Sequence, residues 1–384
     1  MTSRERVLCA LNHQQPDRVP IFIGTSGVTT INTSAYDRLK AHLGIKSETK
    51  AFWRALQYGI LDEEVMVRLH SDARMLVPGA PPSTLARDLT PDRFIDAWGI
   101  TWQLHPGNPY FDMAVHPLSE ATIDDIAKYT WPETAHPSRF SGLREKARKI
   151  QEAGYAVVAL SGISPFEYSY MLRGMDNWFV DLGSDPDFVH ALMGKLTYLM
   201  RTAVEALLDE AGDYIDVVVT GDDLGSQASP LISTPMYREL IKPYHVELFR
   251  AIKQRSKAKI FYHTDGNVYP LLNDLIEAGI DLLNPVHVAA KDMGDTARLK
   301  REFGDRLCFN GGVDTQWVLP KGTTEDVRAE VRRRIQDLAP GGGYILSAVH
   351  CIQQDVPPEN VIALFDEAII SGHYDGPLLS RKSL

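Results

Sequence analysis

Cysteine and long apolar runs are scarce in this sequence. Its 384 residues include only 3 cysteines, Cys9, Cys308 and Cys351, which are too few for a disulfide framework and are typical of a protein kept in a reducing compartment. No stretch reaches the ~20 consecutive apolar residues that a membrane-spanning helix needs, and the first residues lack the apolar core of a signal peptide. We therefore expect a soluble, cytoplasmic protein without a membrane partner.

Clusters of positive charge are also missing. The formal net charge is −10, from 40 Lys and Arg against 50 Asp and Glu, and no long block of like charge occurs. Surfaces that bind nucleic acid need clustered Lys and Arg, so a nucleic-acid partner is not expected. Apolar residues make up 44% of the chain, which is ample material for a substantial core.

A regular alternation of short apolar runs and helical patterns begins near residue 140. The runs lie at 155–160, 214–220, 258–262, 280–283, 306–309 and 341–349, and an earlier one lies at 18–24. They are continuous rather than alternating, which is typical of parallel strands buried on both faces. Seven strands of this kind favour a (β/α)8 TIM barrel. The alternative is an open doubly wound sheet, but no G-x-G-x-x-G follows any strand, which disfavours its dinucleotide-binding version.

One segment interrupts this pattern. Residues 62–131 are irregular and rich in Pro, Gly and aromatic residues. Structureless segments of this length are uncommon in compact domains unless they form lids or insertions. We expect a single barrel domain over residues 1–384, with residues 62–131 as an insertion or lid over the C-terminal mouth.

Polar residues follow nearly every predicted strand. Barrel enzymes place their active sites at the C-terminal ends of the strands, so these residues predict a pocket. Several have simpler explanations: an Asp after a strand often caps the next segment, and an Asn before a Pro is a common turn dipeptide. The candidates are Glu167, Tyr168, Asp222, Asp223, His263, Asp265, Asn267, Asn284, Asp314, His350, Cys351 and Gln353.

His263, Asp265 and His350 form the most suggestive set. The two histidines follow apolar strands at the same predicted rim, and Asp265 is two positions after His263. Neutral imidazole and carboxylate are good ligands for zinc, and a catalytic zinc typically has three protein ligands. The spacing alone leaves two interpretations open, a divalent-metal site or a hydrogen-bonded acid–base site.

Several motifs in order resemble the uroporphyrinogen decarboxylase superfamily. They read DVVVTGDDLGSQ, HTDGNVYPLLNDLIEAGIDLLNPV, FNGGVDTQWVLPKGTTEDVRAEV and PGGGYILSAVHCIQQDVPPENV. The resemblance implies a (β/α)8 barrel. Decarboxylases of this superfamily carry an arginine-rich segment after the first strand that holds substrate carboxylates. The corresponding stretch, IFIGTSGVTTINTSAYDRLK, has no arginine before Arg38, which argues against a substrate with many carboxylates.

The other branch of this superfamily is the corrinoid-dependent methyltransferases. Members that activate thiols bind zinc through His-x-Cys and a second Cys near the last strand. Here the resemblance places His263 and Asp265 at the first motif and His350 at the second, with Cys351 as an alternate ligand. Replacement of thiolates by His and Asp implies a harder metal site suited to oxygen. No D-x-H-x-x-G motif occurs, so the resemblance implies that a partner protein carries the cobalamin.

The leading hypothesis is therefore a methyltransferase that moves a methyl group from a small, methoxy-type substrate to a corrinoid protein. Its expected catalytic residues are His263, Asp265, His350 and Asp223. The residues expected to contact substrate are Glu167, Tyr168, Asp222, Asn267, Asn284, Asp314 and Gln353. Aromatic residues could pack against the substrate or simply fill the core: Trp98, Trp102, Tyr110, Phe111, Phe166, Tyr168 and Tyr170. The alternatives are a decarboxylase of a smaller acid and a non-catalytic ligand-binding barrel, and a homodimer is left open.

Overall fold

A curled parallel sheet organises the chain. The computed structural model describes residues 1–162 and 164–379, and its main sheet has the strand order β13-β12-β11-β10-β9-β8-β3. All six neighbouring pairs run parallel. The strands are β3 (Ala73–Leu76), β8 (Ala156–Leu160), β9 (Val217–Gly221), β10 (Lys259–His263), β11 (Leu282–Val286), β12 (Cys308–Val313) and β13 (Tyr344–Ala348). The expected barrel architecture is confirmed.

The first segment of the chain closes the ring between β13 and β3. Ile21 forms a parallel bridge with Leu346, and the Phe22 N–H donates to the Leu346 carbonyl at 3.0 Å. On the other side, the Asp72 N–H donates to the Ile21 carbonyl at 2.9 Å. Pro20 has no N–H to donate, so the predicted strand at 18–24 is reduced to these few contacts. The described barrel thus has seven regular strands, and the irregular segment around Ile21 and Phe22 takes the place of the eighth.

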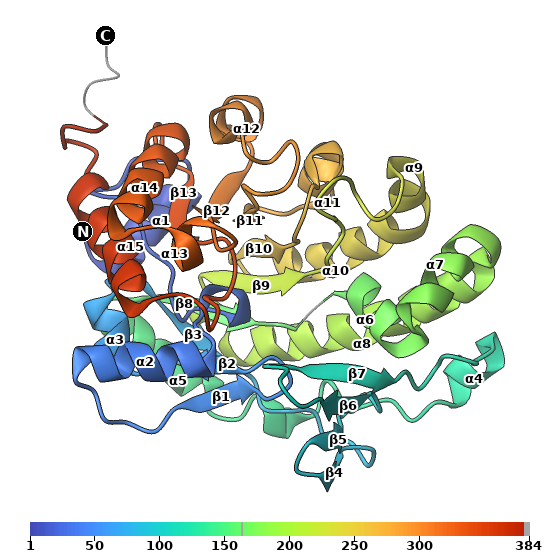
Figure 1. Ribbon diagram of the computed structural model, residues 1–384. Helices are drawn as coiled ribbons and strands as arrows, with labels where there is room; N and C mark the ends of the chain where they lie inside the picture. The colour runs from blue at the N-terminus through green and yellow to red at the C-terminus, as the bar shows by residue number, and fades with distance from the viewer. Residues whose placement is uncertain (163, 380–384) are drawn as a thin grey trace.

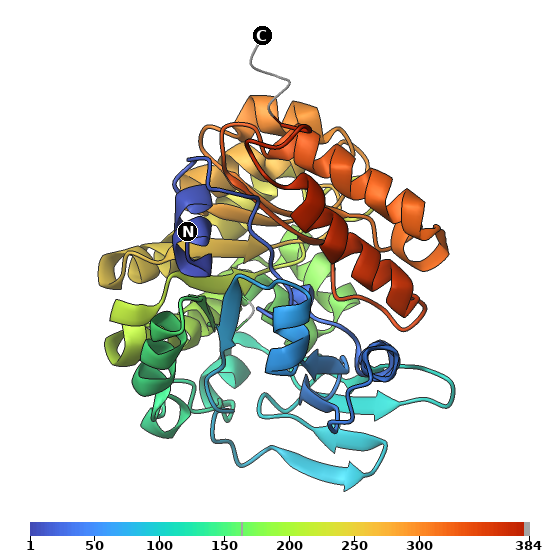
Figure 2. The same cartoon turned by 90° about the vertical axis from the view of Figure 1, so that its left-hand side faces the viewer.

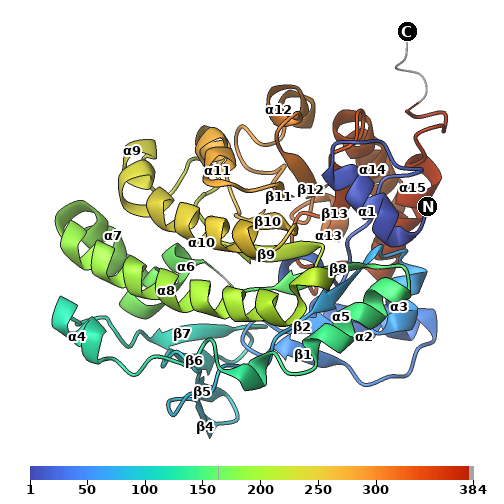
Figure 3. The same cartoon turned by 180° about the vertical axis from the view of Figure 1, so that it is seen from behind.

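Helices surround the sheet, and two apolar layers result from the alternation of strand side chains. Inward residues such as Val158, Phe261 and Ile345 form the barrel interior with α1, while Val157, Ile260 and Leu346 join the core beneath the outer helices. Figure 2 shows α14 beside α15, and Figure 3 shows α8 beside α10. The helices are α1 (Ser3–Leu11), α2 (Thr33–Leu43), α3 (Glu63–Arg68), α4 (Ile123–Lys128), α5 (Leu143–Glu152), α6 (Pro165–Arg173), α7 (Met175–Ser184), α8 (Pro186–Ala211), α9 (Thr234–Met236), α10 (Lys242–Arg255), α11 (Leu272–Ala278), α12 (Thr296–Phe303), α13 (Val318–Lys321), α14 (Thr324–Leu338) and α15 (Pro358–Ser371).

Two small antiparallel sheets lie outside the barrel. A hairpin joins β1 (Lys50–Trp53) to β2 (Tyr58–Ile60), and a four-stranded sheet contains β4 (Arg87–Thr90), β5 (Arg93–Ile95), β6 (Thr101–Leu104) and β7 (Phe111–Val115). Figure 1 shows the four-stranded sheet below the barrel, next to the hairpin. The Phe111 N–H donates to the Ala55 carbonyl at 3.0 Å, and the Trp53 and Trp102 rings meet edge to face with centroids 6.5 Å apart.

The segment 62–131 differs in part from the sequence prediction. Its first portion belongs to the barrel, because α3 precedes β3 and β3 pairs with β8. Residues 87–115 form the separate four-stranded sheet, which contacts the hairpin through Trp102 and the barrel helix α6 through Trp98. The short run Ala73–Leu76, with Arg74 in its middle, lacks the continuous apolar signal of the other strands. Among the helices of the described residues, none is both long and apolar enough to cross a membrane.

Candidate functional site

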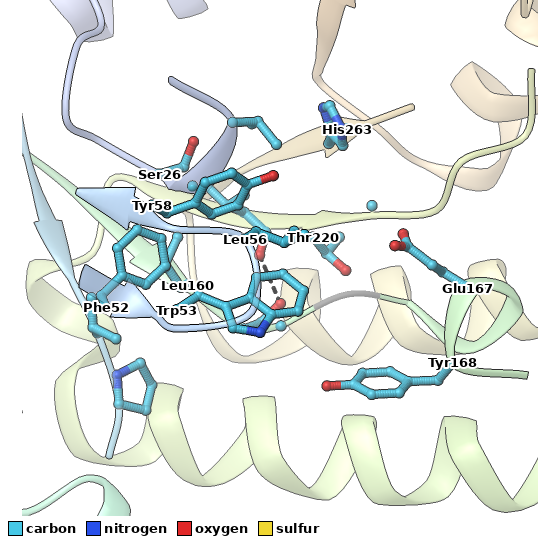
Figure 4. A pocket seen from close by; sticks show the side chains of 18 of the residues that line it. Ser26, Phe52, Trp53, Leu56, Tyr58, Leu160, Glu167, Tyr168, Thr220 and His263 are labelled. Carbon is cyan, nitrogen blue, oxygen red and sulfur yellow. Dashed lines mark hydrogen bonds between the residues drawn. The ribbon is translucent and has the colours of Figure 1, made fainter. Parts of the chain in front are cut away.

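A cavity of about 370 Å³ lies at the C-terminal ends of the barrel strands, a size common for small-molecule sites. Leu160, Val219 and Val28 contribute to its wall and also pack on the barrel interior, so the cavity sits directly on top of the inner core. Figure 4 shows the hairpin side chains on one side of the cavity and His263 and Glu167 on the other. The other lining residues are Ser26, Gly27, Phe52, Trp53, Leu56, Tyr58, Val77, Pro78, Arg139, Ser161, Gly162, Tyr168, Thr220, Gly221, Asp223 and His350.

His263, Asp265 and His350 converge at this rim. One potential ligand atom from each lies within 4.8 Å of the others. The nearest Asp265 carboxylate oxygen, Oδ2, is 4.0 Å from His263 Nε2 and 3.8 Å from His350 Nε2. His263 is the last residue of β10 and His350 follows β13 by two residues, so two distant strands bring the imidazoles together. The sequence prediction that these three side chains meet is confirmed.

A chain of buried amides fixes the tautomer of His263. The Asn310 side chain donates to the Ile345 carbonyl at 2.9 Å, which leaves its Oδ1 to accept from Asn284 Nδ2 at 2.7 Å. Asn284 therefore presents Oδ1 to His263 Nδ1, 2.7 Å away, and that nitrogen must be the donor. In the neutral ring, Nε2 then carries a free lone pair directed toward the carboxylates. An outer hydrogen bond of this kind is what orients imidazoles that ligate metals.

The Asp265 carboxylate has an unsatisfied buried oxygen. Its Oδ1 has no hydrogen-bond partner among the described residues. His287 Nδ1 lies 3.3 Å from it but already accepts the Gly266 N–H at 3.0 Å. Burial acts to raise the pKa of Asp265, but the surrounding imidazoles of His287, His350 and His263 outweigh it and hold that pKa below its usual value.

These observations test whether a metal ion fits the site. Two imidazole nitrogens and one carboxylate make up a usual set of protein ligands for catalytic zinc. Oδ2 of Asp265 faces both histidines and Oδ1 has no hydrogen-bond partner among the described residues, so a cation would compensate the charge of this carboxylate. Burial lowers the pKa of His350 despite the neighbouring carboxylates, so its imidazole stays neutral and able to ligate. The residues present fit a divalent ion.

Glu167 and Asp223 form the acidic side of the cavity. Glu167 lies in the first turn of α6, where its N–H donates to Asp222 Oδ1 at 2.8 Å. Asp223 Oδ1 accepts the Asp265 N–H at 2.9 Å and lies 3.8 Å from His263 Nε2. Burial, followed by the negative charges of Asp223 and Asp222, raises the pKa of Glu167 well above its ordinary value. This shift favours the protonated form of Glu167, which can donate a proton.

Asp222 does not reach the cavity, contrary to its predicted role in substrate binding. It is fully buried and accepts from the Phe166 and Glu167 N–H groups, and its Oδ2 lies 2.7 Å from His245 Nε2. His245 Nδ1 in turn bonds the Tyr237 hydroxyl at 3.0 Å. Successive residues after a strand point to opposite sides, so Asp223 faces the cavity while Asp222 caps α6 from behind. It positions Glu167 and contacts no substrate space.

Four further predicted contacts also lie outside the cavity wall. The Asn267 side chain donates to the Ala228 carbonyl and to Asp292, and Asn284 Oδ1 accepts from His263 Nδ1 on the side away from the cavity. Asp314 accepts from the Gln316 N–H, as a turn residue would, and Gln353 donates to the Cys351 carbonyl. Each side chain is already engaged by local backbone or by a neighbour, which is why it does not line the cavity.

Cys351 is not part of the metal-compatible group. Its side chain is buried, and burial raises the pKa of its thiol, which disfavours the thiolate that would bind a metal. Its Sγ lies 3.9 Å from the Ile352 carbonyl. The structure brings His350, and not Cys351, into the metal-compatible group and the cavity wall at this strand end.

Sequence reasoning missed the hairpin wall and Arg139. Phe52, Trp53 and Tyr58 come from a short hairpin far from any barrel strand end, so the rule that located the other residues did not apply. Of the predicted aromatic residues, only Tyr168 lines the cavity. Trp98 packs behind it with ring centroids 4.2 Å apart.

Comparison with known proteins agrees with the architecture. Curated proteins named uroporphyrinogen decarboxylase match from Chlorobium phaeovibrioides, with 27% identity over 47% of this chain and 49% of that protein, and from Ralstonia nicotianae, with 27% identity over 71% of this chain and 74% of that protein. In the first of these relatives, the chain spans about half of the curated protein's length.

A solved structure named a methyltransferase from Methanosarcina mazei has the same fold. It superposes with a TM-score of 0.65 at 19% identity, and covers 96% of this chain and 98% of the other. The family model described as uroporphyrinogen decarboxylase (URO-D) matches residues 95–369, which include β8 to β13 and all three residues of the metal-compatible group. The chain belongs to the uroporphyrinogen decarboxylase (URO-D) family.

Proposed function

We propose that this protein is a methyltransferase that moves a methyl group from a small methoxy-type substrate to a corrinoid protein. One observation carries the proposal: His263 and His350, which form a metal-compatible group with Asp265, line the same cavity as Glu167, a carboxyl group whose pKa is raised. The fold shared with a methanogen protein named a methyltransferase supports the same reaction class. The absence of arginine between residues 21 and 37 argues against a polycarboxylate substrate.

The chemistry of methyl ethers explains the need for both groups. The methyl–oxygen bond breaks only if the departing oxygen gains a proton or a positive charge, because an alkoxide or phenoxide leaves poorly. Glu167 can donate that proton as the corrinoid of the partner protein attacks the methyl carbon, and the products are an alcohol or phenol and the methylated corrinoid protein. Asp223 accepts the Asp265 N–H and lies 3.8 Å from His263 Nε2, so it is placed to position Asp265 beside that histidine.

A divalent ion at His263, Asp265 and His350, of which zinc is the best match, would supply Lewis acidity toward the substrate oxygen. The amide chain behind His263 holds the Nδ1–H, so Nε2 is the nitrogen that can ligate. The hairpin rings of Phe52, Trp53 and Tyr58 exclude water from the same space and offer flat apolar surface to a ring-bearing substrate (Figure 4).

The decisive assay mixes the protein with reduced cob(I)alamin, or with a reduced corrinoid protein, and a panel of methoxylated compounds. Methyl transfer converts the cob(I)amide spectrum into that of methyl-cob(III)amide. A spectral change that requires the protein and one class of methyl donor supports the proposal. Release of carbon dioxide from a carboxylated substrate, without methylation of any corrinoid, would instead support the second candidate.

That second candidate is a decarboxylase of a small acid. It is favoured by the names of the curated relatives and of the family model. A metal-free decarboxylase has no need for the convergence of His263, Asp265 and His350 beside an unsatisfied carboxylate oxygen, so we rank it second. Because cob(I)amide survives only under reducing conditions and all three cysteines are free thiols, we place the proposed reaction in the cytoplasm.

His263→Ala should remove the metal. Purified wild-type protein is expected to contain about one divalent ion per chain, and the variant close to none, because a catalytic zinc depends on three protein ligands. Elemental analysis after dialysis measures this directly. His42→Ala is the matched control, since His42 lies on α2 with its side chain 40% exposed, and it should retain the metal. Full metal content in His263→Ala would show that the site lies elsewhere.

A further inference from the structure

Arg139 is a cation in the cavity wall without a counter-ion. It ends the short 3-10 helix Pro137–Arg139, and its Nε donates to the Gly79 carbonyl at 2.8 Å. A second guanidinium nitrogen donates to the Thr134 carbonyl. Among the described residues that line the cavity, it is the single Lys or Arg, and no carboxylate of the described chain lies within 4 Å of it. The two carbonyls fix its position but leave its charge uncompensated.

The fully buried arginines of the described chain are paired with carboxylates, whereas half-buried Arg93, like Arg139, contacts none. Arg6 contacts Asp72 at 2.7 Å, Arg74 contacts Glu63 at 2.6 Å, and Arg334 contacts Glu330 at 2.7 Å. Removal of a guanidinium from water costs free energy unless an anion compensates it. Arg139 is half-buried and lacks such an anion, so the cavity itself is where the missing negative charge would bind.

Charge is therefore separated across the cavity. Arg139 lies beside Gly79, just beyond the C-terminal end of β3, together with the cavity residues Val77 and Pro78. The metal-compatible group begins at β10, which is three strand positions away in the order β10-β9-β8-β3. At the usual strand spacing this is on the order of 14 Å along the sheet. Asp223 lies on the far side, where its carboxylate would repel a substrate anion.

The wall between these two ends is apolar. Leu160 and Val28 form its floor on the barrel interior, and the rings of Phe52 and Trp53 face them from the hairpin, as Figure 4 shows for the labelled side chains. A flat apolar body fits this middle section, with a reacting methoxy group toward Glu167 and a charged group toward Arg139. One guanidinium, which binds a carboxylate through paired N–H donors, suits one such group.

We propose that Arg139 is a substrate-binding residue that accepts a single carboxylate, so that the substrate class is a methoxylated aromatic carboxylic acid. The inference rests on the proposed function for the methoxy group, but the anion subsite is a separate claim about binding. A single arginine suits one carboxylate, whereas a cavity that binds many carboxylates would need several cations.

Binding calorimetry tests the subsite without any corrinoid protein. The probes are 4-methoxybenzoate and its neutral isostere 4-methoxybenzamide, with wild-type protein, Arg139→Gln and Arg139→Lys. The wild type should bind the acid more tightly than the amide. Arg139→Gln should weaken binding of the acid by about 10- to 100-fold, as expected for a hydrogen-bonded ion pair, and leave the amide within about twofold. Arg139→Lys should recover part of the difference between the two probes.

Arg144→Gln is the matched control, because Arg144 is half-exposed and pairs with Asp213 away from the cavity, and it should change neither affinity. Equal losses for acid and amide in Arg139→Gln, or a wild type that does not prefer the acid, would overturn the proposal. If the Gln variant does not fold, the acid–amide preference of the wild type and of Arg139→Lys decides. Methyl transfer from methoxybenzoates that is unaffected by Arg139→Gln would refute this inference alone, whereas acid-selective binding without methyl transfer would refute only the proposed reaction.

Discussion

Asp265→Ala should lower methyl transfer by roughly 10³-fold or more, because several kcal/mol of charge stabilisation at the departing oxygen would be lost with the metal. Asp265 is the member of the group that faces both histidines, and its Oδ1 has no other partner among the described residues. The rate is measured by formation of methyl-cob(III)amide. Because Asp265 follows β10 and is not part of the strand, the melting temperature should change little.

Two comparisons make this result specific. Asp37→Ala removes a carboxylate whose side chain is 64% exposed on α2, and it should leave the rate unchanged. Asp265→Asn keeps the shape but not the charge, and it should resemble Asp265→Ala in rate and in metal content. A rate within about tenfold of the wild type in both Asp265 variants, which equals only ~1.4 kcal/mol, would exclude Asp265 as a ligand.

Glu167→Gln should slow methyl transfer by about 10²- to 10⁴-fold, the usual contribution of a general acid. The ordinary pKa of a glutamate is near 4.5, and burial beside Asp223 and Asp222 raises that of Glu167 well above it. The acid form is the active one, so the wild-type rate should be highest below the raised pKa and fall as the pH rises through it. The residual rate of Glu167→Gln should lack this decline.

The pH profile separates proton donation from a structural role. If Glu167 only filled space, the similarly shaped Gln of Glu167→Gln would keep most of the rate. Any loss of rate would then be the same at every pH. Glu48→Gln, at an exposed position, serves as the control and should preserve both rate and profile. A Glu167→Gln variant with the full wild-type rate, or with an unchanged alkaline decline, would remove Glu167 from the mechanism.

The barrel could be predicted because its strands leave a strong signal. Continuous runs such as Val217–Gly221 and Tyr344–Ala348 are buried throughout, and this pattern is read directly from sequence. Two elements of the barrel were harder to recognise from the sequence. The segment at Ile21 forms only isolated pairings and is interrupted at Pro20. Strand β3 is four residues long and has a charged arginine at its second position. Short strands held by tertiary contacts carry too little local pattern to be recognised.

The metal-compatible group could also be predicted, since parallel strands end at one rim and so bring His263 and His350 together. What the sequence did not reveal is which way neighbouring side chains point. Asp222 and Asp223 are adjacent and chemically identical, yet one caps a helix and the other faces the cavity. Arg139 and the hairpin rings were missed because they approach the rim from outside the barrel, through contacts that only the folded chain creates.

The origin of the cavity wall has a consequence for how such proteins diverge. The groups proposed for catalysis follow β9, β10 and β13 or begin α6, whereas Phe52, Trp53, Leu56 and Tyr58 belong to a hairpin outside the barrel. After gene duplication, substitutions within residues 52–58 would reshape the space offered to a substrate while the rim histidines and their amide supports stayed as they are. New substrates could thus be acquired by altering one short surface element, without rebuilding the reactive centre.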